Sequence, residues 1–384
     1  MKKILIVYDR SGQYNVPFIN ELNKLKEFKV SALFLDKDST KKIHYDPLYK
    51  RSVIWNQPKQ NFQSLYSNYS FPSNSLLRIF NGLDHLKNIS FITSFDFVII
   101  HGYDRFFKWI LFLLFKTTRK KIFIRGETHS FSESNDKLLR LIKYLIIKSL
   151  SFLVDGAFPI GTISKNFYKK YNWDIKKILP IVPYTVPDMA TIYTPKLNIQ
   201  KYRKENSFYE KDKKIKFLYL GRLDKRKGFQ LLLDAFKKLE TKNIELDIVG
   251  DGPLKKEIEI KNLKNIIFHG FVENSKIYNY YLKSDFLICP SYYEPWGLVV
   301  NEAYNFGLPV LASNKVASMI DLNGKESDLI FESGNLDDLI YKIELLLKKN
   351  PNWYNKVVKR NLENISLWNN NNSAKILNNY LLDL

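Results

Sequence analysis

The order of apolar runs along this chain of 384 residues constrains its fold more than any other feature. Short apolar runs alternate with segments whose apolar residues have helical spacing, such as 17–28 and 137–150. In the first half, the apolar runs span 3–9, 30–36, 95–102 and 121–127. Continuous apolar runs are typical of buried parallel strands, and strands that alternate with helices indicate βαβ units. The pattern therefore predicts an α/β fold built on a parallel sheet.

The pattern stops and then restarts, which predicts two domains. Residues 180–195 hold four prolines, and the stretch that follows is mostly polar, as expected of a connection between domains. We expect an N-terminal Rossmann-like domain at 1–195 and a C-terminal one at 196–364, with a helix at about 365–384 packing back on the first. Two such domains would face each other across a cleft, with ligands beyond the carboxyl ends of the strands.

The net charge of +21 is unevenly distributed. Residues 1–200 carry 31 Lys and Arg against 15 Asp and Glu, whereas residues 201–384 carry 29 against 24. The first half therefore has the stronger reason to meet an anionic partner, unless its lysines simply form a solvated surface. We expect no nucleic acid, because aromatic and basic residues do not share a stripe and no recognition module is visible.

The cysteine count and the apolar runs bear on the compartment. Cys289 is the single cysteine, which favours a reducing environment. The run after Met1 ends at Asp9, too early for a signal peptide, and the longest apolar run, 109–115, falls well short of the ~18 residues of a membrane span. We expect a cytoplasmic protein. A peripheral location at the inner face of the cytoplasmic membrane is compatible with this prediction.

Two segments that follow expected strands carry candidate chemistry. In LGRLDKRKGF (220–229), four cations lie between a strand and a helix, where they suit a diphosphate; a solvated basic turn is the alternative. In YYEPWGLVVNE (292–302), we expect a helix that starts near Trp296 and ends near Gly307. Glu294 would then lie at the mouth of this helix and Glu302 about two turns inside it.

Helix geometry constrains what these two glutamates do. Eight helical residues advance by roughly 800° and rise by ~12 Å, so Glu294 and Glu302 are not a close acid/base pair. They suit two separated parts of one elongated ligand, with the amides of Gly297 and Leu298 as further donors. The alternatives are a helix-entry carboxylate for Glu294 and an exposed helical residue for Glu302.

A resemblance to a known family rests on five motifs in this order: GRLDKRKG, VGDGP, HGFV, PSYYEPWGLVVNEA and GLPVLAS. Together they resemble the donor domain of retaining glycosyltransferases of the GT-B fold, family 4 (group 1). The EPWGLVVNEA form is frequent among bacterial enzymes that build surface polysaccharides. The resemblance is strong over residues 215–345 and loose in the first half.

The resemblance implies roles for residues of the C-terminal domain. Arg222 and Lys227, with the amides of Gly297 and Leu298, would bind the diphosphate of a nucleotide sugar. Glu294 would contact the transferred sugar and Glu302 the ribose, while Phe271 and Val272 would lie on the side of the nucleobase. The implied reaction is transfer of a sugar, with retention, to a hydroxyl of a glycan or lipid-linked acceptor.

The resemblance also bears on metals and on the acceptor side. No cofactor or metal is expected, because fixed cations supply positive charge, the five histidines lack ligand spacing, and Asp36-Lys37-Asp38 resembles loop punctuation. The resemblance implies that His129, like Glu294, is catalytic and lies near the donor sugar and the acceptor, with Gly12, Arg125 and Glu127 on the acceptor side. The family often has paired glycines where this chain has Gly12 alone.

Three further interpretations remain at this point. The helical segment 137–150 combines an arc of basic residues with apolar ones, so it suits an anionic membrane surface; an ordinary helix packed on the sheet is the alternative. A sugar-nucleotide epimerase or hydrolase of the same fold would need no acceptor. A basic nucleic-acid-binding protein is the remaining alternative.

Overall fold

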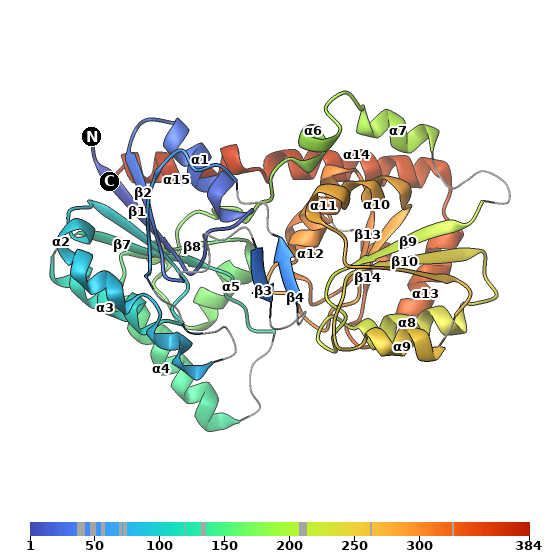
Figure 1. Ribbon diagram of the computed structural model, residues 1–384, viewed down its shortest axis with the longest axis horizontal. Coiled ribbons are helices and arrows are strands. Elements are labelled where there is room, and N and C mark those ends of the chain that lie inside the picture. The colour runs from blue at the N-terminus through green and yellow to red at the C-terminus, as the bar shows by residue number, and fades with distance from the viewer. Residues whose placement is uncertain are drawn as a thin grey trace. The chain divides into compact units, whose positions relative to one another are not determined.

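A computed structural model describes residues 1–36, 43–46, 51–54, 58–68, 71, 75–118, 120–131, 136–206, 213–261, 263–324 and 326–384. The chain forms two compact units. Unit 1 consists of Met1–Pro187 and Asn370–Leu384, and unit 2 of Asp188–Asn369. Each unit is built on a parallel sheet with helices on both faces, as the alternation in the sequence predicted (Figure 1).

Unit 1 contains a six-stranded parallel sheet in the order β5-β2-β1-β6-β7-β8. Side chains of β1 alternate between two apolar clusters, with Leu5 and Val7 on one face and Ile4 and Ile6 on the other. The strands are β1 (Lys3–Tyr8), β2 (Lys29–Phe34), β5 (Gln63–Tyr66), β6 (Phe97–His101), β7 (Lys121–Gly126) and β8 (Gly156–Pro159), and β3 (Ile43–Asp46) and β4 (Arg51–Ile54) form a separate antiparallel pair. The helices are α1 (Asn15–Lys24), η2 (Leu76–Phe80), η3 (Leu83–Asn88), α2 (Ile89–Ile92), α3 (Phe106–Thr117), α4 (Lys137–Leu153), α5 (Thr162–Lys170), η4 (Ile175–Lys177) and α15 (Asn370–Leu382).

Unit 2 repeats this architecture with the strand order β11-β10-β9-β12-β13-β14. One continuous apolar cluster surrounds its central strands. The strands are β9 (Ile215–Leu220), β10 (Ile244–Val249), β11 (Ile266–Gly270), β12 (Phe286–Cys289), β13 (Val310–Ser313) and β14 (Ile330–Phe331). The helices are α6 (Met189–Tyr193), α7 (Ile199–Glu205), α8 (Phe229–Lys238), α9 (Lys255–Lys261), η5 (Asn274–Lys276), α10 (Tyr278–Lys283), α11 (Leu298–Asn305), α12 (Ala317–Leu322), η6 (Ser327–Leu329), α13 (Leu336–Leu347) and α14 (Pro351–Leu367).

The boundary between the units differs from the one expected after residue 195. The chain passes from unit 1 to unit 2 at Pro187 and Asp188, because α6 packs on unit 2. Met189 lies in the apolar cluster of unit 2, and the Tyr193 ring stacks on Tyr278 with 5.2 Å between ring centroids. The expected C-terminal helix on unit 1 corresponds to α15, which packs against α1 and begins at Asn370.

Arg203 ties α7 to the rest of unit 2. Its side chain is buried, and its guanidinium donates to the carbonyl oxygens of Phe306 at 2.8 Å and Ser284 at 2.6 Å, and to that of Tyr281. These carbonyls belong to the ends of helices that are distant in sequence, so one side chain satisfies several acceptors at once.

Among the described helices, none combines the length and the apolar character that crossing a membrane requires.

Replacing Arg203 with Met should destabilise unit 2 strongly, because buried carbonyl groups would lose their donors. We expect a loss of about 3 kcal/mol or more in the free energy of unfolding, measured by urea denaturation. Lys201→Met on the same helix is the matched control, since Lys201 is exposed and should change stability by only about 0.5 kcal/mol. Equal losses in both variants would contradict the role assigned to Arg203.

Candidate functional site

The candidate site of unit 2 is built from two turns that follow neighbouring strands. Residues 221–228 join β9 to α8, and residues 290–297 join β12 to α11. Because β9 pairs with β12 in parallel, both turns leave the sheet at the same edge. Side chains 67 residues apart in sequence can therefore meet here.

A close approach of backbones holds the two turns together. Gly228 has φ +67°, and a Cβ at this position would lie 1.9 Å from the carbonyl oxygen of Pro290. The backbone N–H of Tyr292 donates to the carbonyl of Arg226 at 2.9 Å. Only glycine combines this backbone conformation with so short an approach, so Gly228 sets the spacing between the turns.

The two turns bring Lys227 and Glu294 into contact. Lys227 Nζ donates to Glu294 Oε1, and this carboxylate oxygen also accepts a hydrogen bond from the Ser291 hydroxyl at 2.7 Å. The Ser313 hydroxyl in turn donates to the carbonyl of Ser291. Glu294 is buried, whereas Lys227 is partly exposed, so the carboxylate has a fixed position and the ammonium keeps access to solvent.

Asp224 organises the basic turn itself. Its Oδ2 accepts from the Arg222 guanidinium, and its Oδ1 accepts from the backbone N–H of Lys227 at 2.8 Å. One carboxylate therefore positions both predicted phosphate-binding residues. Roles for Asp224 and Ser291 were not predicted from the sequence, although both lie inside the motifs. Among the side chains of these motifs, only the cations and the two glutamates were assigned roles.

The start of α11 corrects the expected placement of Glu302. The helix begins at Leu298 and not near Trp296, because Gly297 precedes it with φ +96°. Glu302 therefore lies about one turn inside the helix. It is buried, in contrast to the exposed alternative, and its Oε2 accepts from the Tyr281 hydroxyl at 2.7 Å. The helix ends as expected, with Gly307 at φ +62° after the C-cap Phe306.

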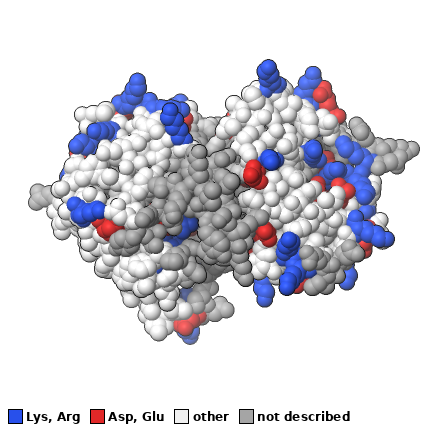
Figure 2. Space-filling model, viewed as in Figure 1, with Lys and Arg blue, Asp and Glu red and all other residues white. Residues whose placement is uncertain are grey.

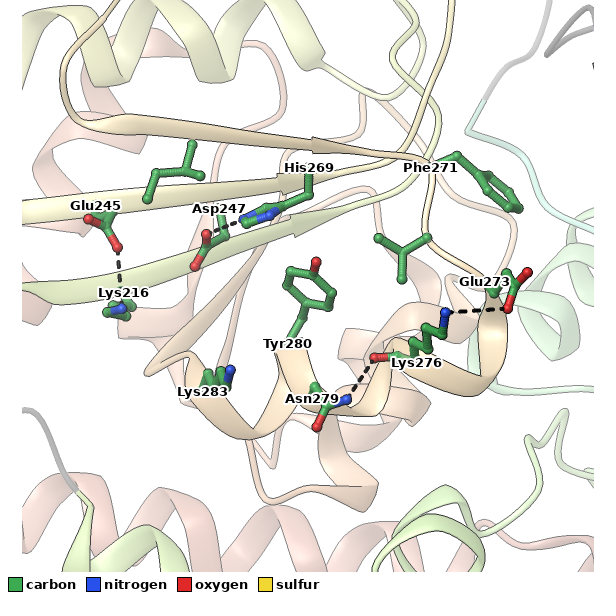
Figure 3. A pocket seen from close by; sticks show the side chains of 12 residues that line it. Lys216, Glu245, Asp247, His269, Phe271, Glu273, Lys276, Asn279, Tyr280 and Lys283 are labelled. Carbon is green, nitrogen blue, oxygen red and sulfur yellow. Dashed lines mark hydrogen bonds and ion pairs between the residues drawn. The ribbon is translucent and has the colours of Figure 1, made fainter.

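Phe271 and Val272 lie at one end of a groove of about 860 Å³ on unit 2. Figure 3 shows this groove between the strands that carry Asp247 and His269 and the helix that carries Tyr280. His269 Nε2 lies 2.5 Å from Asp247 Oδ1, and its ring meets that of Tyr280 edge-on, 4.8 Å between centroids. The two residues predicted on the nucleobase side thus border a cavity large enough for a planar ring.

The thiol of Cys289 and the residues considered as metal ligands have defined surroundings. Burial raises the pKa of the Cys289 thiol to about 12, so the group stays protonated near neutral pH. Within the described residues, no three His, Cys, Asp or Glu side chains gather in a way that could hold a metal ion. Lys37 and Asp38 lie outside the described residues, and Asp36 accepts hydrogen bonds from Arg10 at 2.8 Å and Asn81 at 2.6 Å.

In unit 1, Arg125 has a set of internal partners. Its guanidinium donates to the Tyr8 hydroxyl at 3.0 Å and to the carbonyl of Pro183 at 2.9 Å, and it lies over the Phe18 ring. His101 stacks on Tyr8 with 4.7 Å between centroids. Burial, and then the positive charges of Arg125 and Lys108, lower the pKa of His101 to about 3, so its imidazole is neutral at physiological pH.

The other residues predicted on the acceptor side lie on loops of unit 1. Glu127 and His129 follow β7, which ends at Gly126. Glu127 is exposed, and its side chain forms a hydrogen bond with that of Tyr184. His129 Nδ1 accepts a hydrogen bond from the backbone N–H of Phe131 at 3.2 Å. Gly12 precedes α1 and donates its N–H to Asn15 Oδ1 at 2.8 Å. Their roles towards an acceptor stay predictions.

Part of the C-terminal half matches the model of a known family. Residues 198–363 match the family model described as "Glycosyl transferases group 1". The chain is 28% identical to the "Uncharacterized 41.2 kDa protein in cps region" of Klebsiella pneumoniae over 58% of its own length and 62% of that protein. It is 34% identical to the "Amylovoran biosynthesis glycosyltransferase AmsD" of Erwinia amylovora over 30% of its own length and 35% of that protein. The chain thus spans less than two thirds of either relative.

Solved structures share the fold over the whole chain. A sucrose-phosphate synthase from Thermosynechococcus elongatus has a TM-score of 0.73 at 15% identity, covering 100% of this chain and 99% of that one. The Anabaena protein Alr3699/HepE, solved with UDP and glucose, has a TM-score of 0.68 at 14% identity, and all of both chains is covered. The two parallel six-stranded sheets therefore form the GT-B fold predicted from the motifs.

Replacing Gly228 with Ala should destabilise unit 2, because the new Cβ would collide with the Pro290 carbonyl and strain the backbone. We expect a loss of at least ~2 kcal/mol in the free energy of unfolding, measured in urea. Gly221→Ala is the matched control in the same turn, since the nearest atom to its Cβ would be the Tyr219 hydroxyl at 3.6 Å. A Gly228→Ala protein as stable as Gly221→Ala would refute the spacing role.

Proposed function

We propose that this chain transfers a sugar from a nucleoside-diphosphate sugar to a hydroxyl of a glycan, and the match of residues 198–363 to the group 1 glycosyl transferase model supports this. The observation that carries the proposal is the Lys227–Glu294 contact at the ends of β9 and β12. It places a cation suited to phosphate beside a buried carboxylate suited to sugar hydroxyls. We assign the reaction to the retaining class, family 4.

The cations of the site act on the leaving group. As the bond between the anomeric carbon and the diphosphate oxygen breaks, its electron pair stays on the diphosphate. Arg222, Lys227 and the amides of Gly297 and Leu298 stabilise this charge. The acceptor oxygen bonds to the anomeric carbon on the same face, and its proton passes to the departing oxygen. Lys227 has three N–H donors, so it can hold Glu294 and a phosphate oxygen together.

The two glutamates hold different parts of the donor. Glu294 accepts from hydroxyls of the transferred sugar, and Ser291 fixes its orientation. Glu302 accepts from the ribose hydroxyls with the carboxylate oriented by Tyr281. The nucleobase lies on the side of Phe271 and Val272, where the groove begins. The separate partners of Glu294 and Glu302 support separate roles for the two carboxylates.

We propose that the reaction needs no metal ion, because Arg222 and Lys227 supply fixed positive charge to the diphosphate. The acceptor belongs to cell-surface polysaccharide synthesis and is carried on a lipid at the inner face of the cytoplasmic membrane. Support comes from a relative in a cps region, a relative named for amylovoran biosynthesis, and the basic first half of the chain. His129, Glu127, Arg125 and Gly12 would lie on the acceptor side.

A thermal-shift panel of UDP-, GDP-, ADP- and CMP-sugars tests the donor site. We expect one nucleotide class to raise the melting temperature, and Glu302→Gln to weaken its binding about 10- to 100-fold, because a charge-assisted contact to the ribose is lost. Glu363→Gln, on exposed α14 surface, is the matched control and should bind as the wild type does. If no sugar nucleotide stabilises the wild type, the donor site is wrongly assigned.

The transfer reaction separates this proposal from an epimerase or a hydrolase. With labelled donor and membrane lipid extract, we expect label to enter a lipid-linked product. The anomeric configuration of the product should be the same as that of the donor, and EDTA should not change the rate. Glu294→Gln should lower the rate at least ~100-fold. Sugar release or isomerisation without the extract would favour the hydrolase or the epimerase, and inhibition by EDTA would refute metal independence.

A further inference from the structure

The outward face of α4 is apolar, which is the reverse of an ordinary helix packed on a sheet. Large side chains recur along it at helical spacing and are between 38% and 65% exposed: Leu138, Leu139, Leu141, Ile142, Leu145, Ile146 and Phe152. The buried residues of the helix, Ile147, Leu150 and Ser151, lie on the opposite side and near its C-terminal end. In Figure 1 the N-terminal part of α4 projects away from the sheet of unit 1.

Neighbouring elements extend this apolar surface. Helix α3 packs against both α4 and η2, and it exposes Phe106 and Leu113. On η2, Leu76, Leu77 and Ile79 are exposed, and the Phe80 ring lies 6.3 Å from that of Phe106. We call the exposed apolar side chains of α4, α3 and η2 the apolar face. Contiguous exposed surface of this kind marks an interaction site in a water-soluble protein.

Basic residues outnumber acidic ones beside the apolar face, although the exposed N-cap of α4 is Asp136. None of the three elements contains Asp or Glu, whereas α4 carries Lys137, Arg140, Lys143 and Lys148 and α3 exposes Lys116. Lys108 of α3 is buried and pairs with Asp9 and Asp104. Lys148 donates to the carbonyl of Asn172 at 2.6 Å, and Lys143 lies over the Phe167 ring. These two basic groups therefore point back towards the body of unit 1, beside the apolar side chains and not among them. The part of α4 that faces the viewer in Figure 2 is mostly uncharged.

We propose that the apolar face inserts into the surface of an anionic lipid bilayer. Leucine, isoleucine and phenylalanine side chains would enter the acyl boundary, and the exposed basic residues Lys137, Arg140 and Lys116 would lie near the phosphate headgroups. A second copy of this chain fits less well, because the exposed basic residues beside the two faces would repel each other. The proposal rests on the proposed function for its purpose, which is to hold the enzyme beside a lipid-linked acceptor.

Because the apolar side of α4 faces outward, the proposal predicts a different salt dependence from binding by charge alone. A helix held by its lysines alone would leave the membrane when salt screens them, since the Debye length falls from ~8 Å at 0.15 M to ~3 Å at 1 M. A helix that buries its apolar face keeps most of its affinity, because burial of apolar area does not depend on salt in this way. Binding should therefore need apolar insertion and be strengthened by anionic lipid.

Flotation with vesicles tests the apolar face without donor or acceptor. We expect the full chain to float with phosphatidylcholine vesicles that contain phosphatidylglycerol, and to stay bound in part at about 1 M salt. The double variant Leu141→Glu/Leu145→Glu should lower the partition coefficient into the vesicles at least ~10-fold, because two leucine side chains would no longer be buried in the bilayer. Leu382→Glu, on α15 of the same unit, is the matched control, since Leu382 is exposed to a similar degree.

Three results would overturn the proposal. The wild type could fail to float with these vesicles, the double variant could float as well as the wild type, or salt alone could release the wild type completely. A dimer in solution that Leu145→Glu dissociates, without vesicle binding, would assign the face to a second copy. Thermal unfolding and the nucleotide-sugar shift of each variant show whether it is folded, so failure here is distinguishable from failure of the donor site.

Discussion

The candidate site depends on the approach of the Gly228 backbone to the Pro290 carbonyl. The pairing of β9 with β12 brings two turns to one sheet edge, but sheet pairing alone does not fix their spacing. A side chain at position 228 would push the turns apart. Because glycine allows the contact, Lys227 reaches Glu294 across 67 residues of sequence, and Ser291 and Asp224 fix the two partners from either side.

This construction holds charge in place before a ligand arrives. Arg222 and Lys227 each have a carboxylate partner, Asp224 and Glu294, and both carboxylates are buried. The cations therefore have little conformational freedom left to lose, and the diphosphate of the proposed function would meet donors that are already held in place. Preorganisation of this kind lowers the reorganisation that the developing negative charge demands. The buried acids thus position the cations.

Sequence patterns predicted both parallel sheets, because apolar runs and glycine turns are local signals. They misplaced the unit boundary, since α6 owes its place to contacts of Met189 and Tyr193 with distant residues. They also placed the start of α11 too early, because the left-handed conformation of Gly297 depends on tertiary structure. The Lys227–Glu294 contact could not be predicted from the sequence either, because no local pattern encodes a contact between residues so far apart.

The helix α4 shows a different limit of sequence reasoning. Its periodicity reveals two unlike faces, but it does not say which one meets the body of the protein. The structure buries the shorter strip around Ile147 and Leu150 and leaves the larger apolar side outward. An exposed face of this size invites aggregation unless something covers it. The lysines beside it and the basic balance of residues 1–200 favour an anionic bilayer as the cover, which gives the uneven charge of the chain a physical purpose.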